Sequence, residues 1–170
     1  MQPIDATQVV HELFKDGESL AKKFNLSFYQ RAPNKKVLLE TDPTLIRIIL
    51  QNMISNAMKY SRKGKSVTIH LETDEKKVMF AVEDEGVGIP TKDQERVFQR
   101  FFRAKNVRQM DTDGNGLGLY ITKAIVERLG GTISFKSKEN VGTTFTVAFP
   151  IGNITPKKKP EEQKRDPKAS

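Results

Sequence analysis

Residues 77–90 read KVMFAVEDEGVGIP, an almost continuous apolar run that ends in an acidic, glycine-rich turn. Such a run predicts a strand covered on both of its faces. Asp84 ends the run, and Gly86 and Gly88 follow it in a spacing that allows backbone to approach a ligand closely. A carboxylate here can accept a hydrogen bond from the exocyclic amine of adenine, whereas it would repel the carbonyl oxygen of guanine. An ordinary glycine turn is the alternative.

A second glycine cluster, GNGLGL at residues 114–119, leads directly into a predicted helix. Free N–H groups and the positive end of a helix dipole make such a junction a binding site for phosphates. The cluster lacks the pattern of a P-loop, and its G-x-G-x-G spacing after a loop differs from a dinucleotide-binding turn. A lone glycine cluster is not specific to one class of site.

The third feature is a polar stripe on a helix predicted over about 43–60, which begins after Asp42, a capping side chain. Asn52, Asn56 and Lys59 are spaced i, i+4 and i+7, so they share one face of this helix. Magnesium prefers oxygen ligands and keeps water and phosphate oxygens around it. Neutral amide oxygens can therefore hold the ion of a magnesium triphosphate without adding repulsion, and a lysine can neutralise the phosphates. An ordinary polar helix face is the alternative.

The rest of the chain predicts further helices and strands from its apolar spacing. Thr91 and Gln94 have the spacing of a capping box, residues 103–113 have no apolar pattern, and Gly130-Gly131 ends the last helix. The predicted helices cover 5–24, 91–101 and the segment after the second glycine cluster, and the strands cover 26–30, 37–40, 66–72, 132–137 and 143–149. Three long helices and sequence-adjacent strands favour a two-layer α/β (α+β) sandwich with a mixed, largely antiparallel sheet of about five strands.

Composition excludes several classes of protein. The chain has 170 residues, no cysteine and two histidines, so disulfide frameworks, thiolate zinc sites and multi-histidine metal centres are not expected. No apolar run reaches the roughly 18–20 residues of a membrane helix, and no signal peptide is visible. We expect a cytoplasmic location, although the full-length protein could be membrane-anchored.

The net charge is +8, and residues 151–170 are rich in Pro, Lys and Glu. This composition predicts a disordered basic tail.

In this order, the motifs resemble those of the ATP-binding catalytic domain of sensor histidine kinases from two-component systems. That family belongs to the GHKL superfamily of the Bergerat fold, with gyrase, heat-shock chaperones and mismatch-repair ATPases. The resemblance covers about residues 5–150, and we expect residues 1–150 to form this domain. The asparagine box, first glycine box, phenylalanine box, second glycine box and final strand correspond to NMISNAMKYS (52–61), DEGVGIP (84–90), VFQRFFRA (97–104), GNGLGLYITKAIVERLGG (114–131) and GTTFTVAFP (142–150).

The resemblance implies ATP and Mg²⁺ as ligands and assigns roles to residues at the matching positions. Asn56 and Asn52 would bind magnesium, Asp84 would read the adenine amine, and residues 103–115 would form an ATP lid. The catalytic set would be Asn56, Lys59, Arg100 and Arg103. The nucleotide-binding set would be Asn52, Asn56, Lys59, Tyr60, Asp84, Gly86, Gly88, Ile89, Gly114, Gly116, Leu117, Gly118, Leu119 and Thr143.

The family's phosphoacceptor histidine lies on a helical hairpin, and the chain shows no such hairpin before the domain. His11 is followed by Glu12 and Leu13, but residues 14–16 depart from the family's H-E-[LI]-[RK]-[TN]-P pattern, and His70 is given no role. We therefore expect the acceptor on a separate domain, in the same full-length protein or in trans, and a response regulator further downstream. Because the family dimerises through that hairpin, we expect this domain alone to be monomeric.

Several alternatives are open. ATP-hydrolysing members of the superfamily carry a glutamate one turn before the key asparagine, whereas this chain has Asn52, which is not a base at neutral pH. We therefore expect slow intrinsic hydrolysis. A serine kinase of the anti-sigma type and a non-catalytic nucleotide-sensing docking module are the other candidates. The tail lacks aromatic residues for base stacking, so no nucleic-acid partner is expected.

Overall fold

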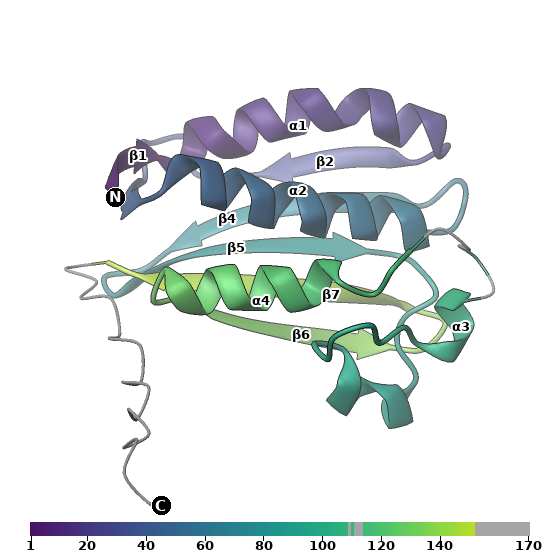
Figure 1. The fold of residues 1–170 in the computed structure, drawn as a ribbon. Coiled ribbons are helices and arrows are strands. Elements are labelled where there is room, and N and C mark those ends of the chain that lie inside the picture. The colour runs from purple at the N-terminus through teal and green to yellow at the C-terminus, as the bar shows by residue number, and fades with distance from the viewer. Residues whose placement is uncertain (109, 111–113, 152–170) are drawn as a thin grey trace, which may run out of the picture.

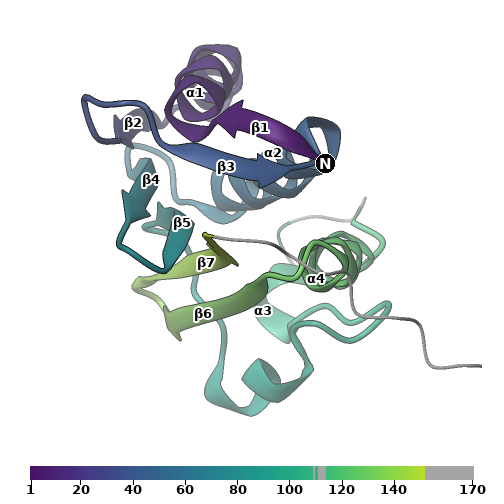
Figure 2. The ribbon, with the colours of Figure 1, turned by 90° about the vertical axis from the view of Figure 1, so that its left-hand side faces the viewer.

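The structure is a computed structural model that describes residues 1–108, 110 and 114–151. It has two layers, a five-stranded sheet and a layer of helices on one of its faces (Figure 1, Figure 2). The elements in chain order are β1 (Gln2–Asp5), α1 (Ala6–Lys23), β2 (Ser27–Arg31), β3 (Leu38–Thr41), α2 (Pro43–Tyr60), β4 (Ser66–Thr73), β5 (Lys77–Asp84), the 3₁₀ helix Thr91–Arg96, α3 (Lys105–Arg108), α4 (Gly118–Arg128), β6 (Thr132–Lys138) and β7 (Gly142–Pro150). The predicted sandwich is confirmed.

The sheet order is β2-β4-β5-β7-β6, and all its neighbouring pairs are antiparallel except the parallel pair β2–β4. The strands β6 and β7, which are adjacent in the sequence, form an antiparallel hairpin. A second, two-stranded antiparallel sheet joins β1 to β3. The strand β1 is not predicted from the sequence, because four residues ahead of a strong helix are too few to show strand periodicity.

Aspartates begin the two long helices that cover the sheet. Oδ1 of Asp5 accepts a hydrogen bond from the backbone N–H of Thr7 at 3.0 Å, and Oδ1 of Asp42 accepts one from Thr44 at 2.9 Å. Each carboxylate thus satisfies an N–H group that the first helical turn leaves without a partner. The helices predicted over 5–24 and 43–60 are confirmed.

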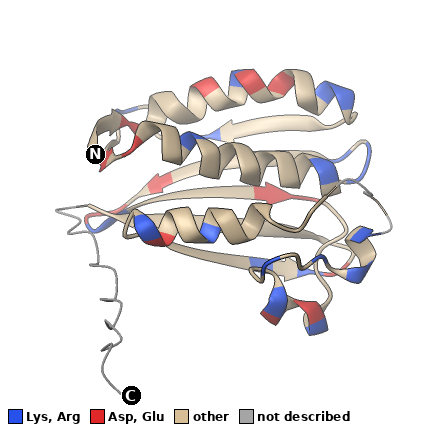
Figure 3. Cartoon of the chain, in the orientation of Figure 1, with Lys and Arg blue, Asp and Glu red and all other residues tan. Residues whose placement is uncertain are grey.

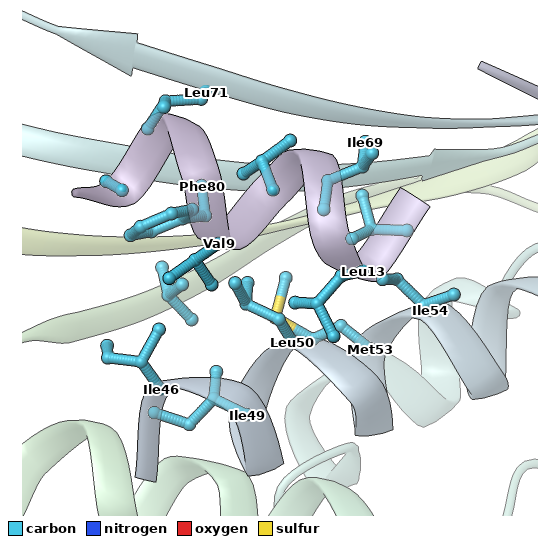
Figure 4. Packing of buried hydrophobic residues seen from close by; sticks show 14 of the residues in the cluster. Val9, Leu13, Ile46, Ile49, Leu50, Met53, Ile54, Ile69, Leu71 and Phe80 are labelled. Carbon is cyan, nitrogen blue, oxygen red and sulfur yellow. The ribbon is translucent and has the colours of Figure 1, made fainter. Parts of the chain in front are cut away.

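The core lies between the helices and the sheet. Figure 4 shows side chains of α1, α2, β4 and β5 gathered there, among them Leu13, Met53 and Phe80, which are at most 2% exposed. One prediction for β5 is wrong, because only alternate residues of this strand are buried. The helices cover a single face of the sheet, and Met79 and Ala81 lie half-buried on the other face.

The segment between β5 and α4 differs from its prediction. The helix predicted over 91–101 is a 3₁₀ helix that ends at Arg96, and the capping box does not form. Instead, the Gln94 side-chain amide donates to the carbonyl oxygen of Ile89 at 3.0 Å. The expected loop 103–113 contains the short helix α3, and its residues 109 and 111–113 lie outside the described residues, as do residues 152–170 of the predicted tail.

Candidate nucleotide-binding site

A cavity of about 310 Å³ opens between α2, the end of β5, the start of α4 and the segment 97–107, and its volume is at the lower end of the usual range for ligand pockets. Lysines and arginines gather around this end of the molecule, on the last turn of α2, in the loop that follows it and on α3 (Figure 3). The predicted site residues that line the cavity are Asn52, Asn56, Lys59, Tyr60, Asp84, Gly88, Ile89, Arg103, Gly114, Gly116, Gly118, Leu119 and Thr143.

Asp84 is the buried carboxylate of this cavity, with 8% of its surface exposed. Its Oδ1 accepts hydrogen bonds from the backbone N–H groups of Gly86 at 2.9 Å and Thr143 at 3.2 Å. Burial raises the pKa of Asp84 to about 6, while these two hydrogen bonds oppose the rise and the nearby charge of Glu83 adds to it. A carboxylate held in this way is mostly ionised at neutral pH, and no described residue donates a hydrogen bond to its second oxygen.

The first glycine turn is held against neighbouring backbone. A Cβ atom on Gly86 would lie 2.3 Å from the carbonyl oxygen of Tyr60, and one on Gly88 would lie 2.1 Å from that of Lys138. The side-chain amide of Asn106 donates to the carbonyl oxygen of Gly88 at 2.9 Å, so α3 is also attached to this turn. The turn therefore connects α2, β6 and α3 around the cavity.

Replacing Gly88 with alanine is expected to lower stability by at least about 1 kcal/mol, because alanine would need a positive φ of 62° and its Cβ would overlap backbone. Thermal or urea unfolding measures the loss. Gly64→Ala is the matched control, since Gly64 also has a positive φ but a Cβ atom on it would meet nothing within 4 Å. Equal losses in the two variants would show that the close contact at Gly88 does not matter.

The polar stripe of α2 faces the cavity as its spacing predicts. Asn52, Asn56 and Lys59 all line it, and Nδ2 of Asn52 donates to Oγ1 of Thr122 on α4 at 2.6 Å. The side chain of Asn56 makes no hydrogen bond to another described residue. Two amide oxygens are thus available for a cation, which suits Mg²⁺ when phosphate and water oxygens complete its coordination.

The second glycine cluster and the preceding segment form the opposite wall. Gly116 has a φ of 69°, and the N-cap residue of α4, Leu117, offers no side-chain acceptor to the first turn of the helix. Nη1 of Arg103 donates to the carbonyl oxygen of Gly114 at 2.8 Å, which brings together two residues that are 11 positions apart. The first turn of α4 thus lies at the cavity with N–H groups suited to phosphates.

Three predicted site residues do not line the cavity, namely Gly86, Leu117 and Arg100. Gly86 acts on the cavity indirectly, through its hydrogen bond to Asp84. The Arg100 guanidinium lies 4.8 Å from the centroid of the Phe101 ring, and Phe101 is 60% exposed. The structure therefore does not bring Arg100 to the cavity, and its catalytic role stays a prediction.

Most of the apolar wall is not predicted from the sequence, although Ile89 and Leu119 are. The additional lining residues are Ser55, Ala57, Val87, Val97, Phe102, Ala104, Val107, Asn115 and Phe145. Most of them are hydrophobic side chains whose spacing resembles that of ordinary core residues, so no sequence signal separates them from the core. An apolar wall beside the buried carboxylate of Asp84 suits a flat, weakly polar ring such as a nucleobase.

A pH dependence follows from the raised pKa of Asp84. The ordinary pKa of an aspartate is 3.8, and the pKa of Asp84 in the folded protein is about 6. The protonated carboxyl therefore contributes to the free energy of unfolding in full below pH 3.8, and this contribution is lost as the pH rises through about 6. Between these two pH values, the free energy of unfolding of the wild type should fall by up to about 3 kcal/mol relative to that of Asp84→Asn in the absence of nucleotide. Urea unfolding from pH 4 to pH 8 tests this, and a constant difference between the two proteins would contradict it.

Comparisons with known proteins agree with this geometry. Residues 41–153 match the family of histidine kinase-, DNA gyrase B- and HSP90-like ATPases. The chain is 39% identical over 140 residues to the sensor histidine kinase WalK of Bacillus subtilis, covering 81% of this chain and 23% of WalK. It is 38% identical over 150 residues to the sensor-like histidine kinase SenX3 of Mycobacterium tuberculosis, covering 88% of this chain and 36% of SenX3.

Solved structures of histidine kinases have a similar fold. The catalytic domain of the histidine kinase ThkA, in a nucleotide-free form, matches with a TM-score of 0.76 and 28% identity over 88% of this chain and 94% of that one. The mycobacterial sensor histidine kinase MprB matches with a TM-score of 0.75 and 25% identity, over 88% of this chain and 97% of the MprB chain.

Among the described residues, no helix is long and apolar enough to cross a membrane. The chain therefore belongs to the histidine kinase-, DNA gyrase B- and HSP90-like ATPase family, whose ligand is ATP, and has the fold of a histidine kinase catalytic domain.

Proposed function

We propose that the chain binds Mg-ATP in this cavity and transfers the γ-phosphoryl group to a histidine of a phosphoacceptor hairpin domain. The hairpin domain then passes the phosphoryl group to a response regulator. The cavity carries the proposal, because it collects Asp84, Asn56 and the second glycine cluster from separate segments of the chain. The chain spans about a quarter to a third of the length of WalK and SenX3. The acceptor therefore lies elsewhere in a full-length protein or in trans, and we place the reaction in the cytoplasm, where ATP is available.

The residues divide into three groups by chemistry. Asp84 and Thr143 would read the adenine edge, with Ile89 and other apolar side chains against the ring. Lys59, Arg103 and the first turn of α4 would neutralise and hold the phosphates. Asn56 and Asn52 would hold Mg²⁺ through their amide oxygens, and the ion would neutralise charge that develops on the phosphoryl oxygens.

The transfer needs few groups from this chain. A ring nitrogen of the acceptor histidine supplies the electron pair for the new N–P bond, and the bond between the γ-phosphorus and the bridging oxygen breaks. ADP leaves with the electron pair of that broken bond, and the other ring nitrogen of the histidine releases its proton to a base of the acceptor domain or to water. Catalysis would rest on positioning and charge stabilisation. Asn52 occupies the position from which a glutamate would activate water, so hydrolysis by the domain alone should be slow.

The direct test mixes the domain with γ-labelled ATP, Mg²⁺ and a set of isolated histidine hairpin domains. We expect label on at least one hairpin, bound through an acid-labile and alkali-stable linkage, and little label released as phosphate without a hairpin. An acid-stable linkage on a serine of an added protein would favour the anti-sigma type of kinase. Binding of ATP with no transfer to any hairpin tested would favour the docking module, and brisk hydrolysis that Asn52→Ala abolishes would contradict the assigned roles.

A further inference from the structure

A buried threonine lies directly behind one of the proposed magnesium ligands. Thr122 of α4 is 1% exposed and is not among the residues that line the cavity. Its Oγ1 accepts the 2.6 Å hydrogen bond from Nδ2 of Asn52 on α2. None of the roles proposed above uses this hydroxyl. Thr122 does not line the cavity, so it can influence a bound ligand through its hydrogen bond to Asn52.

The side-chain amide of Asn52 has two possible orientations, and only one of them presents oxygen to a cation. In the structure Nδ2 is used by Thr122, and no described residue donates a hydrogen bond to Oδ1. The amide lies beside the first turn of α4, because a Cβ atom on Gly118 would be 2.9 Å from Oδ1 and 3.1 Å from Nδ2. Asn52 also lines the cavity, so its amide oxygen is left for a ligand there.

The hydroxyl of Thr122 holds the orientation seen in the structure. Its Oγ1 accepts from the NH₂ group of Asn52 at 2.6 Å in a position almost closed to water, since Thr122 is 1% exposed. Without the hydroxyl, the NH₂ group would lose this acceptor, and the preference for presenting the amide oxygen to the cavity would be lost with it.

We propose that Thr122 is a positioning residue that holds the Asn52 amide with its oxygen toward the metal-binding side of the cavity. The inference rests on the proposed function, because the orientation of Asn52 affects the ligand only if the nucleotide binds together with a cation. Supporting partners of this kind orient metal ligands in many proteins, and their loss commonly lowers metal affinity about 10- to 100-fold.

The test compares Thr122→Val, which removes the hydroxyl and keeps the shape, with Thr122→Ser, which keeps the hydroxyl. Calorimetric titration with a non-hydrolysable ATP analogue is run with Mg²⁺ and again with EDTA. We expect valine to weaken binding about tenfold in Mg²⁺ only, and serine to behave as the wild type. Thr122→Ala replaces the valine variant if thermal unfolding shows that valine prevents folding.

Two further readouts separate orientation from packing. In protein without nucleotide, Thr122→Val should shift the side-chain amide resonances of Asn52 in a ¹⁵N spectrum, and Thr122→Ser should not. In an Asn52→Ala background, Thr122→Val should cause no additional loss of Mg²⁺-dependent affinity, because the group that it orients is absent.

The outcomes distinguish the two proposals. Equal losses with Mg²⁺ and with EDTA would show a structural role and overturn the inference, as would serine behaving like valine. Unchanged Mg²⁺-dependent affinity in Thr122→Val would overturn the inference and leave the proposed function intact. A wild-type protein that binds the analogue no better with Mg²⁺ than with EDTA would overturn both.

Discussion

Replacing Asp84 with asparagine is expected to weaken binding of a non-hydrolysable ATP analogue about 100-fold, with little loss of stability. Oδ1 of Asp84 already accepts the N–H groups of Gly86 and Thr143. The asparagine oxygen would take that place, and its NH₂ group would point to where the second carboxylate oxygen was. The site would then present a donor to the adenine amine, which is itself a donor. Calorimetric titration at pH 7.5 measures the loss.

The same substitution should change the base preference of the cavity. Guanine has a carbonyl oxygen where adenine has its amine, so an NH₂ group at residue 84 should raise the affinity for a GTP analogue relative to the ATP analogue. Glu83→Gln is the matched control, because Glu83 is an exposed carboxylate that is hydrogen-bonded to His70 and does not line the cavity. Unchanged ATP binding and unchanged base preference in Asp84→Asn would exclude Asp84 as the adenine-reading residue.

The elements that carry local signals could be predicted from the sequence. Asp42 followed by Pro43 predicts the start of α2, and the i, i+4, i+7 spacing predicts that Asn52, Asn56 and Lys59 share one face. Which residues share a helix face depends only on their spacing along the helix, so it can be predicted without knowing how the helix packs. The same holds for the turn after Asp84, where glycines allow the backbone contacts that place the carboxylate.

The features that depend on distant contacts could not be predicted. The capping-box spacing of Thr91 and Gln94 suggests a helix start, but in the fold Gln94 bonds to the carbonyl oxygens of Ile89 and Ser137. Likewise, Thr122 meets Asn52 across 70 residues of sequence. Each of these contacts is set by how two elements pack, which single-sequence periodicity does not report.

Asn56→Ala is expected to reduce phosphoryl transfer to a histidine hairpin about a thousandfold, because several kcal/mol of charge stabilisation by the cation would be lost. The side chain of Asn56 makes no hydrogen bond to another described residue, so the variant should fold with nearly wild-type stability. Affinity for the ATP analogue in EDTA should be almost unchanged, while the gain in affinity that Mg²⁺ brings should disappear. Transfer kinetics and titration with and without Mg²⁺ measure these three quantities.

The control for Asn56 comes from the same helix. Gln51 carries a similar amide on an exposed position of α2 and does not line the cavity, so Gln51→Ala should leave both transfer and Mg²⁺ dependence unchanged. Asn56→Asp keeps an oxygen ligand but adds a negative charge beside the phosphates, so its transfer rate should lie between alanine and wild type. If Asn56→Ala transferred phosphate at the wild-type rate, the cation would have to be held elsewhere, and the amide stripe of α2 would be an ordinary polar face.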